Sequence, residues 1–142
     1  MLVISYQILR DCRDLKEEVE QYEDRLRSMD PAGQTGQRVD GMPRSTKISR
    51  PTEDAAIVYM EVVEMMEELI SRRQAMIAEI LRACMELKSL QRRIIICRYI
   101  EAMSWKEIVY ELQYSKTWIL EQHNAAIKSL TGEDADTSDQ IW

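Results

Sequence analysis

Side chains that could catalyse a reaction or bind a metal ion are few and scattered in this sequence. His123 is the only histidine, and the three cysteines, Cys12, Cys84 and Cys97, lack the spacing of metal ligands. No glycine-rich phosphate loop occurs, and the acids lie on exposed helix faces beside basic residues and not as apolar pairs. We expect no enzyme, catalytic residue, metal or cofactor. His123 should have a half-buried packing role, and the cysteines should be reduced among apolar neighbours.

The basic side chains indicate a different chemistry, because they are concentrated in one part of an acidic chain. The formal net charge is −6. Residues 87–130 contain seven Lys or Arg and four Glu, which gives this segment +3 and leaves −9 for the remaining residues. Such an asymmetry favours a polyanion as the partner of this segment, although an ordinary charged surface would give the same pattern.

Short helices with defined ends would position these basic residues. The pattern predicts a helix over 89–100 and a break over 101–103. Ser104 and Glu107 then form a capping box that opens a second helix. After a short turn, Ser115 caps a third helix. Its inward face is expected to hold Ile119, His123, Ala126, Ile127 and Leu130.

A short helix, a tight turn and a longer capped helix are the layout of a helix-turn-helix. In that motif the first helix lies against the DNA backbone and the last helix enters the major groove. The same spacing also fits a small three-helix bundle without any DNA partner. Both interpretations remain open on spacing alone.

The segment also resembles a known family. The residues that carry the resemblance are Arg98-Tyr99-Ile100, Ser104-Trp105-Lys106-Glu107-Ile108, Leu112, Ser115, His123 and the run 125–130. They are similar to region 4 of sigma factors, and in particular to the phage-encoded ArpU and RinA-like regulators of late transcription. The stretch 40–44 is also similar to those regulators. The resemblance implies DNA binding by the third helix and control of phage or prophage genes.

Two positions depart from the family pattern. Gln113 stands where the family has a turn glycine, and Met103 stands where it has the glycine before the capping serine. Non-glycine residues can form turns in the right-handed and bridge conformations, and we expect these conformations here.

The resemblance implies a set of DNA contacts. Contacts from the start of the third helix would involve Ser115, Lys116, Thr117, Leu120, Glu121 and Asn124. Lys116 would reach a guanine or a phosphate, Thr117 a base or a thymine methyl, and Asn124 an adenine. Phosphate contacts, which give affinity without sequence information, would come from Arg92, Arg93, Arg98, Lys106 and Lys128.

The first 88 residues have the pattern of two long helices. From Ile8 to Met29, apolar residues recur at spacings that alternate between four and three residues. The same spacing recurs from Tyr59 to Leu87, where Arg73 is the one polar member. This repeat predicts an antiparallel helical hairpin in which Arg73 fixes the register. The second helix has further apolar residues, which predict self-association as a homo-oligomer. These are Val58, Val62, Met65, Leu69, Met76 and Leu81.

The expected fold is therefore all-α: a hairpin over 1–88, a sigma region 4-like helix-turn-helix over 89–131 and a disordered acidic tail over 132–142. Residues 30–52 contain all three prolines and are expected to form a mobile linker, with Thr52 as the next helix cap. No apolar run reaches the roughly 18 residues that a membrane span needs, and no signal peptide is evident. We expect a cytoplasmic protein without a membrane partner.

Three functions remain in competition. The first is a transcription regulator that binds double-stranded DNA and uses its long helices for self-association or for docking on RNA polymerase. The second is a small terminase subunit for DNA packaging. Footprinting would distinguish the first two functions, because a protected promoter site supports the regulator and a protected packaging site supports the terminase subunit. The third is a coiled-coil adaptor that binds protein. Salt-dependent binding of the chain to random duplex would count against this adaptor function.

Overall fold

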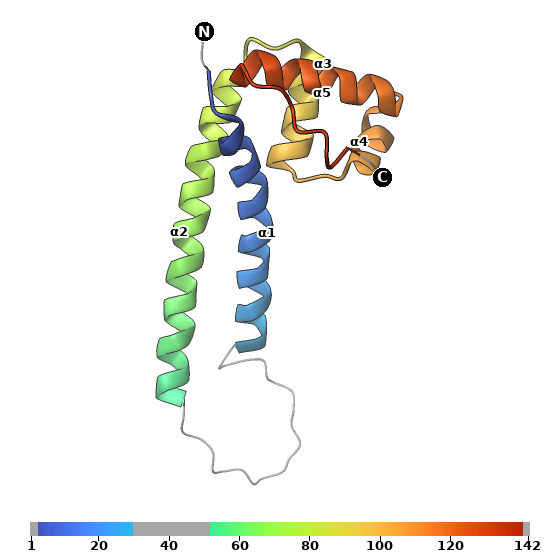
Figure 1. The fold of residues 1–142 in the computed structure, drawn as a ribbon. Coiled ribbons are helices and arrows are strands. Elements are labelled where there is room, and N and C mark those ends of the chain that lie inside the picture. Colours follow the sequence, from blue (N-terminus) through green and yellow to red (C-terminus); the bar gives the residue numbers. More distant parts are fainter. Residues whose placement is uncertain (1–2, 30–51, 141–142) are drawn as a thin grey trace. The chain divides into compact units, whose positions relative to one another are not determined.

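The computed structural model describes residues 3–29 and 52–140, except for the side chains of residues 52 and 53, and every regular element in these ranges is a helix. The elements are α1 (Tyr6–Met29), α2 (Thr52–Cys84), α3 (Ser89–Ile95), the π-helical turn η2 (Ile96–Ile100), α4 (Trp105–Leu112) and α5 (Lys116–Thr131) (Figure 1). The all-α class is thus confirmed. The linker expected at 30–52 and the Thr52 cap lie outside what the structure describes, apart from the backbone of residue 52. None of the described helices is both long and apolar enough to cross a membrane.

The chain divides into two compact units. One comprises Met1–Glu17 and Arg72–Trp142, and the other comprises Glu18–Ser71. We expected a boundary between residues 88 and 89. The structure instead groups the start of α1 and the end of α2 with the short helices, because they share one apolar cluster.

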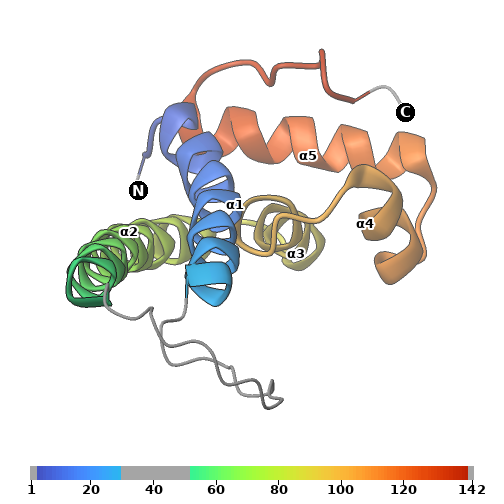
Figure 2. The ribbon, with the colours of Figure 1, turned by 90° about the horizontal axis from the view of Figure 1, so that it is seen from below.

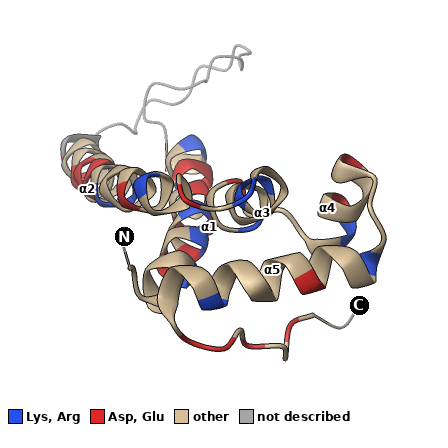
Figure 3. Cartoon of the chain, turned by 90° about the horizontal axis from the view of Figure 1, so that it is seen from above, with Lys and Arg blue, Asp and Glu red and all other residues tan. Residues whose placement is uncertain are grey.

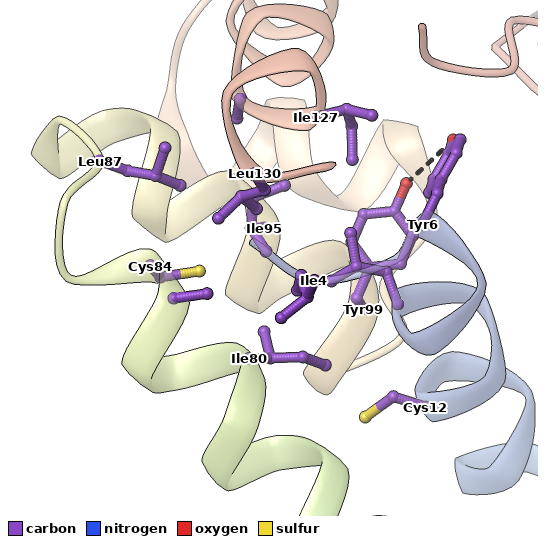
Figure 4. Packing of buried hydrophobic residues seen from close by; sticks show 13 residues of the cluster. Ile4, Tyr6, Cys12, Ile80, Cys84, Leu87, Ile95, Tyr99, Ile127 and Leu130 are labelled. Atoms are coloured by element: carbon purple, nitrogen blue, oxygen red, sulfur yellow. Dashed lines mark hydrogen bonds between the residues drawn. The ribbon is translucent and has the colours of Figure 1, made fainter. Parts of the chain in front are cut away.

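The larger cluster of the first unit joins four helices and the residues before α1. Ile80 and Cys84 of α2, Ile95 of α3 and Ile127 of α5 are fully buried in it, and Ile4 packs with them (Figure 4). Burying a side chain of this size contributes about 1.5–3 kcal/mol. This cluster therefore holds the short helices against the ends of the long ones within this unit.

A second cluster lies on the other side of α3. Ile94 is its central residue from α3, and it packs with Trp105, Ile108 and Leu112 of α4 and Ile119 of α5. Three of these side chains have no exposed surface: Ile94, Ile108 and Ile119. The cluster fixes α4 to α3 and α5.

Arg73 interrupts the apolar repeat of α2 as expected, but its partners are backbone groups. Its Nε donates to the carbonyl of Cys12 at 2.8 Å, and Nη2 donates to the carbonyl of Ile100. The Ile100 carbonyl is at the end of η2, where helical carbonyls lack partners within the helix. Arg73 thus connects α1, α2 and the end of η2.

The second unit contains the last residues of α1 and the first residues of α2. Leu26 and Val62 are buried in it, and Met29 lines the same shallow groove as Asp54, Ala55 and Val58. The end of α1 and the start of α2 therefore lie next to each other. Several apolar side chains of α2 remain exposed here, namely Ile57, Val58, Met60 and Met65.

The residues after α5 are not a disordered tail over the range that the structure describes. Gly132 ends α5 in the left-handed conformation, with φ of 76°. The chain then turns back and runs along α5 (Figures 1 and 2). Gln140 is 7% exposed, and Asp139 forms an ion pair. The acids led us to expect disorder, but basic and polar partners elsewhere in the unit fix this segment.

A pair of adjacent substitutions tests the larger cluster. Ile80→Ala should destabilise the protein by about 2–4 kcal/mol, because it removes buried apolar atoms and leaves a cavity. Leu81→Ala is the control, since Leu81 is 42% exposed and exposed substitutions usually change stability by no more than about 0.5 kcal/mol. Urea unfolding followed by circular dichroism measures both, and equal midpoints would contradict this packing.

Candidate nucleic-acid interface

Helix α4 begins with the capping box that the sequence predicts. The Glu107 amide donates to Ser104 Oγ at 3.2 Å, and the Ser104 amide donates to Glu107 Oε1 at 2.8 Å. These hydrogen bonds lower the pKa of Glu107. Opposite the exposed cap, Trp105, Ile108 and Leu112 are buried. Local sequence and tertiary packing thus agree on where α4 starts and which face it buries.

The two turns around α4 are made by non-glycine residues with positive φ. Gln113 ends α4 with φ of 62°, and Ala102 precedes it with φ of 58°. We expected right-handed or bridge conformations at Gln113 and Met103. This prediction is wrong for Gln113, whose φ is positive. In the turn before Ser104, the residue with positive φ is Ala102. Such a backbone costs a non-glycine residue about 1 kcal/mol or more. At Gln113 the left-handed conformation lets its amide close α4 by donating to the Val109 carbonyl.

Helix α5 begins three residues later and is also capped as expected. Ser115 Oγ accepts from the Trp118 amide at 3.2 Å. The five residues predicted to face inward are all buried. Thr117, Glu121 and Lys128 are exposed along the opposite face. α5 therefore presents one polar line to solvent.

The predicted contact residues differ in how accessible they are. Six are exposed: Arg93, Lys106, Ser115, Thr117, Glu121 and Lys128. Four are half-buried: Arg92, Lys116, Leu120 and Asn124. The structure thus brings Lys106 of α4 and the polar line of α5 into one unit. α5 itself carries two lysines and one glutamate, so its basic charge is sparse (Figure 3).

Arg98 does not fit the predicted role as a phosphate contact. It is 4% exposed, because the π-helical turn η2 directs it into the unit. Its Nη1 donates to the Met103 carbonyl at 3.0 Å, its Nη2 pairs with Asp139 at 2.5 Å, and its guanidinium lies 4.4 Å from the Trp105 ring centroid. Arg98 therefore stabilises the break before α4.

Arg92 is also engaged within the protein. Its Nε donates to the Cys84 carbonyl at 3.2 Å, and its Nη2 donates to the Leu87 carbonyl at 3.1 Å. These carbonyls lie at and just after the end of α2, where helical acceptors need outside donors. Arg92 therefore helps to end α2, and its phosphate contact stays a prediction.

His123 is more deeply buried than we expected. It is 1% exposed and lies between Tyr99 and Asn124: Nε2 is 2.8 Å from Tyr99 Oη, and Nδ1 is 3.0 Å from Asn124 Oδ1. Since an amide oxygen can only accept, Nδ1 carries the proton and Nε2 accepts from Tyr99. Trp105 packs edge-on against the ring, with centroids 4.7 Å apart.

Two residues of this network have partners that the sequence did not reveal. Tyr99 stacks on His123 and contacts Tyr6 Oη at 3.5 Å. Gln140 donates from Nε2 to Asn124 Oδ1 at 2.8 Å. Both pairings join segments far apart in the chain, which a local pattern does not reveal.

The cysteines are buried and free, as expected. Burial raises the pKa of Cys12 and Cys97, and that of Cys84 to about 11. Thiols with such pKa values are poor nucleophiles and poor metal ligands at neutral pH. Among the described residues, no group of His, Cys, Asp or Glu is arranged to hold a metal ion.

The His123 network predicts a pH dependence of stability. Burial lowers the pKa of His123 to about 4, so the unfolded chain takes up this proton near pH 6.5 but the folded chain only near pH 4. The free energy of unfolding should therefore fall as the pH drops from about 6.5 to 4, by a few kcal/mol. His123→Gln, which does not titrate, should flatten this slope in urea unfolding. Parallel curves for parent and variant would contradict the assignment.

The chain matches no protein-family model, no curated protein and no solved structure. A functional interpretation therefore rests on the geometry and charges of α4 and α5.

Proposed function

We propose that this chain is a sequence-specific DNA-binding protein that regulates transcription, and that α4 and α5 are its helix-turn-helix. In this proposal α5 lies in the major groove, and α4 lies across the backbone above it. The observation that carries it is the exposed polar line of α5 opposite a buried face that is apolar except for His123 and Thr131. A helix that reads bases needs such a line, because base edges are recognised by hydrogen-bonding side chains.

The two helix starts support the same arrangement. Ser104 and Ser115 cap α4 and α5 with exposed side chains, and a helix N-terminus is a favourable place for a phosphate. Lys106 is exposed in the first turn of α4, which suits a phosphate contact. Thr117 and Glu121 would face base edges, and Lys128 would face the backbone.

The long helices would supply the assembly that transcription regulators of this kind need. We propose that α1 and α2 form a hairpin that mediates self-association, with RNA polymerase as a further docking partner. The exposed apolar residues of α2 in residues 57–65 support an apolar interface there. A symmetric dimer would place two copies of α5 on one duplex.

One observation favours a protein-binding adaptor as a second candidate. Three aromatic side chains near the turn between α4 and α5 are exposed, with Tyr110 at 78%, Tyr114 at 44% and Trp118 at 43%. Tyr110 also lines a shallow groove beside α4 with Met103 and Lys106. Exposed aromatics are typical of protein interfaces, and the low basic charge of α5 fits this candidate as well.

Substitutions on the exposed line distinguish the two candidates. Lys106→Ala should weaken binding to all duplexes and reduce the slope of log affinity against log salt by about 0.9, because one phosphate contact is lost. Thr117→Ala should instead lose about 1–3 kcal/mol of preference at one base pair. Fluorescence anisotropy with selected and random duplexes, each at two salt concentrations, measures both effects.

Arg82→Ala is the matched control, because it removes an exposed cation from α2 and not from α4 or α5. It should change affinity less than Lys106→Ala does. If the parent does not bind duplex at all, or if Lys106→Ala and Arg82→Ala behave alike, the DNA-binding proposal fails and the adaptor becomes the better interpretation.

A further inference from the structure

Residues 133–140, here named the acidic segment, contain four acids and no basic residue. The segment follows the turn at Gly132 and lies beside α5, running back toward α4 (Figures 1 and 3). It therefore borders the helix that we propose to enter the major groove. Its acids are Glu133, Asp134, Asp136 and Asp139.

Contacts outside α5 anchor the acidic segment. Asp139 pairs with the buried Arg98 at 2.5 Å. The Asp136 amide donates to Tyr6 Oη at 3.3 Å, and the Tyr6 amide donates to Glu133 Oε2 at 3.4 Å. The path of the segment is thus fixed at both ends.

The same anchor region is rich in arginine. A cavity of about 110 Å³ is lined by Arg10 and Arg13 of α1 together with Arg98, Asp136 and Asp139. The Nε atoms of Arg10 and Arg13 are buried and have no hydrogen-bond partner among the described residues. Carboxylates of the acidic segment therefore lie among guanidinium groups, which also bind phosphate well.

Two groups proposed to contact DNA are occupied by the segment. Gln140 donates to Asn124 Oδ1 at 2.8 Å, which engages the amide that would read an adenine. Asp134 lies 3.4 Å from Lys128 Nζ, which would neutralise a phosphate. Each contact therefore competes with DNA for a group that would bind it.

We propose that the acidic segment is an intramolecular competitor of DNA, which lowers the affinity of α5 for any duplex until it is displaced. This inference rests on the proposed function. The contact between Asp134 and Lys128 suits displacement, because ion pairs between exposed partners are weak in water and are screened by salt. Asp134 is 93% exposed and Asp139 is 55% exposed. Release of the segment would remove the Gln140 contact from Asn124 and the Asp134 contact from Lys128 together, and the hydrogen bond from His123 to Asn124 would remain.

Asp139→Asn tests the proposal by weakening the anchor. The matched control is Glu86→Gln, which also removes one negative charge, at an exposed side chain that lies outside the acidic segment. Any general effect of lower negative charge appears in both variants. Asp139→Asn should bind a random duplex roughly threefold more tightly than Glu86→Gln does, because the segment is then held less firmly.

Two further measurements keep the test independent of folding. Asp134→Asn changes an almost fully exposed side chain and should also bind more tightly than the control. In the parent, hydrogen exchange of amides 133–140 should become faster when duplex is added, since the segment leaves α5.

Equal affinities for Asp139→Asn, Asp134→Asn and the control Glu86→Gln, with no faster exchange on adding duplex, would overturn the proposal. The segment would then be a structural strap on α5, and the DNA-binding proposal would stand. Absence of duplex binding by the parent and by every variant would instead remove the proposed function, and this inference with it.

Discussion

Helix α3 is short, yet it has to be buried on two sides at once. Ile94 and Ile95 are neighbours in the sequence, and successive residues point about 100° apart around a helix. Ile94 therefore enters the cluster with α4 and the start of α5, whereas Ile95 enters the cluster with α1, α2 and the end of α5. Neither cluster could form without α3 between them, so the placement of α4 and α5 depends on this helix.

The π-helical turn η2 follows α3 directly and is also buried, but its buried residues include polar ones. Cys97, Arg98 and Tyr99 are consecutive and all buried, which requires partners for a guanidinium and a phenol inside the unit. Asp139 and the Met103 carbonyl satisfy Arg98, and His123 satisfies Tyr99. These pairs connect η2 to α5 and to the acidic segment. The surface that we propose for DNA is consequently supported by a buried polar network and by apolar packing.

Local sequence signals predicted much of this structure. The caps at Ser104 and Ser115 and the inward face of α5 follow from hydrogen bonds and periodicity within a few residues, and they were predicted. The roles of Arg92, Arg98 and residues 133–140 were not, because charge alone does not show whether an arginine meets a carbonyl, a carboxylate or a solvent molecule. The partners of Arg92 and Arg98 lie between 5 and 41 residues away, and Tyr6 lies 127 and 130 residues from its partners Glu133 and Asp136. The left-handed Gln113 was missed because glycine is the usual residue in that conformation.

The central claim is that the exposed line of α5 meets DNA. The most direct measurement is amide chemical-shift mapping of the full ¹⁵N-labelled chain, titrated with a random duplex at low salt. The largest shifts should fall on residues 104–106 and 115–128 and fade as salt is added, because the contacts are largely electrostatic. Shifts confined to α1 and α2, or no shifts at any salt concentration, would contradict the claim.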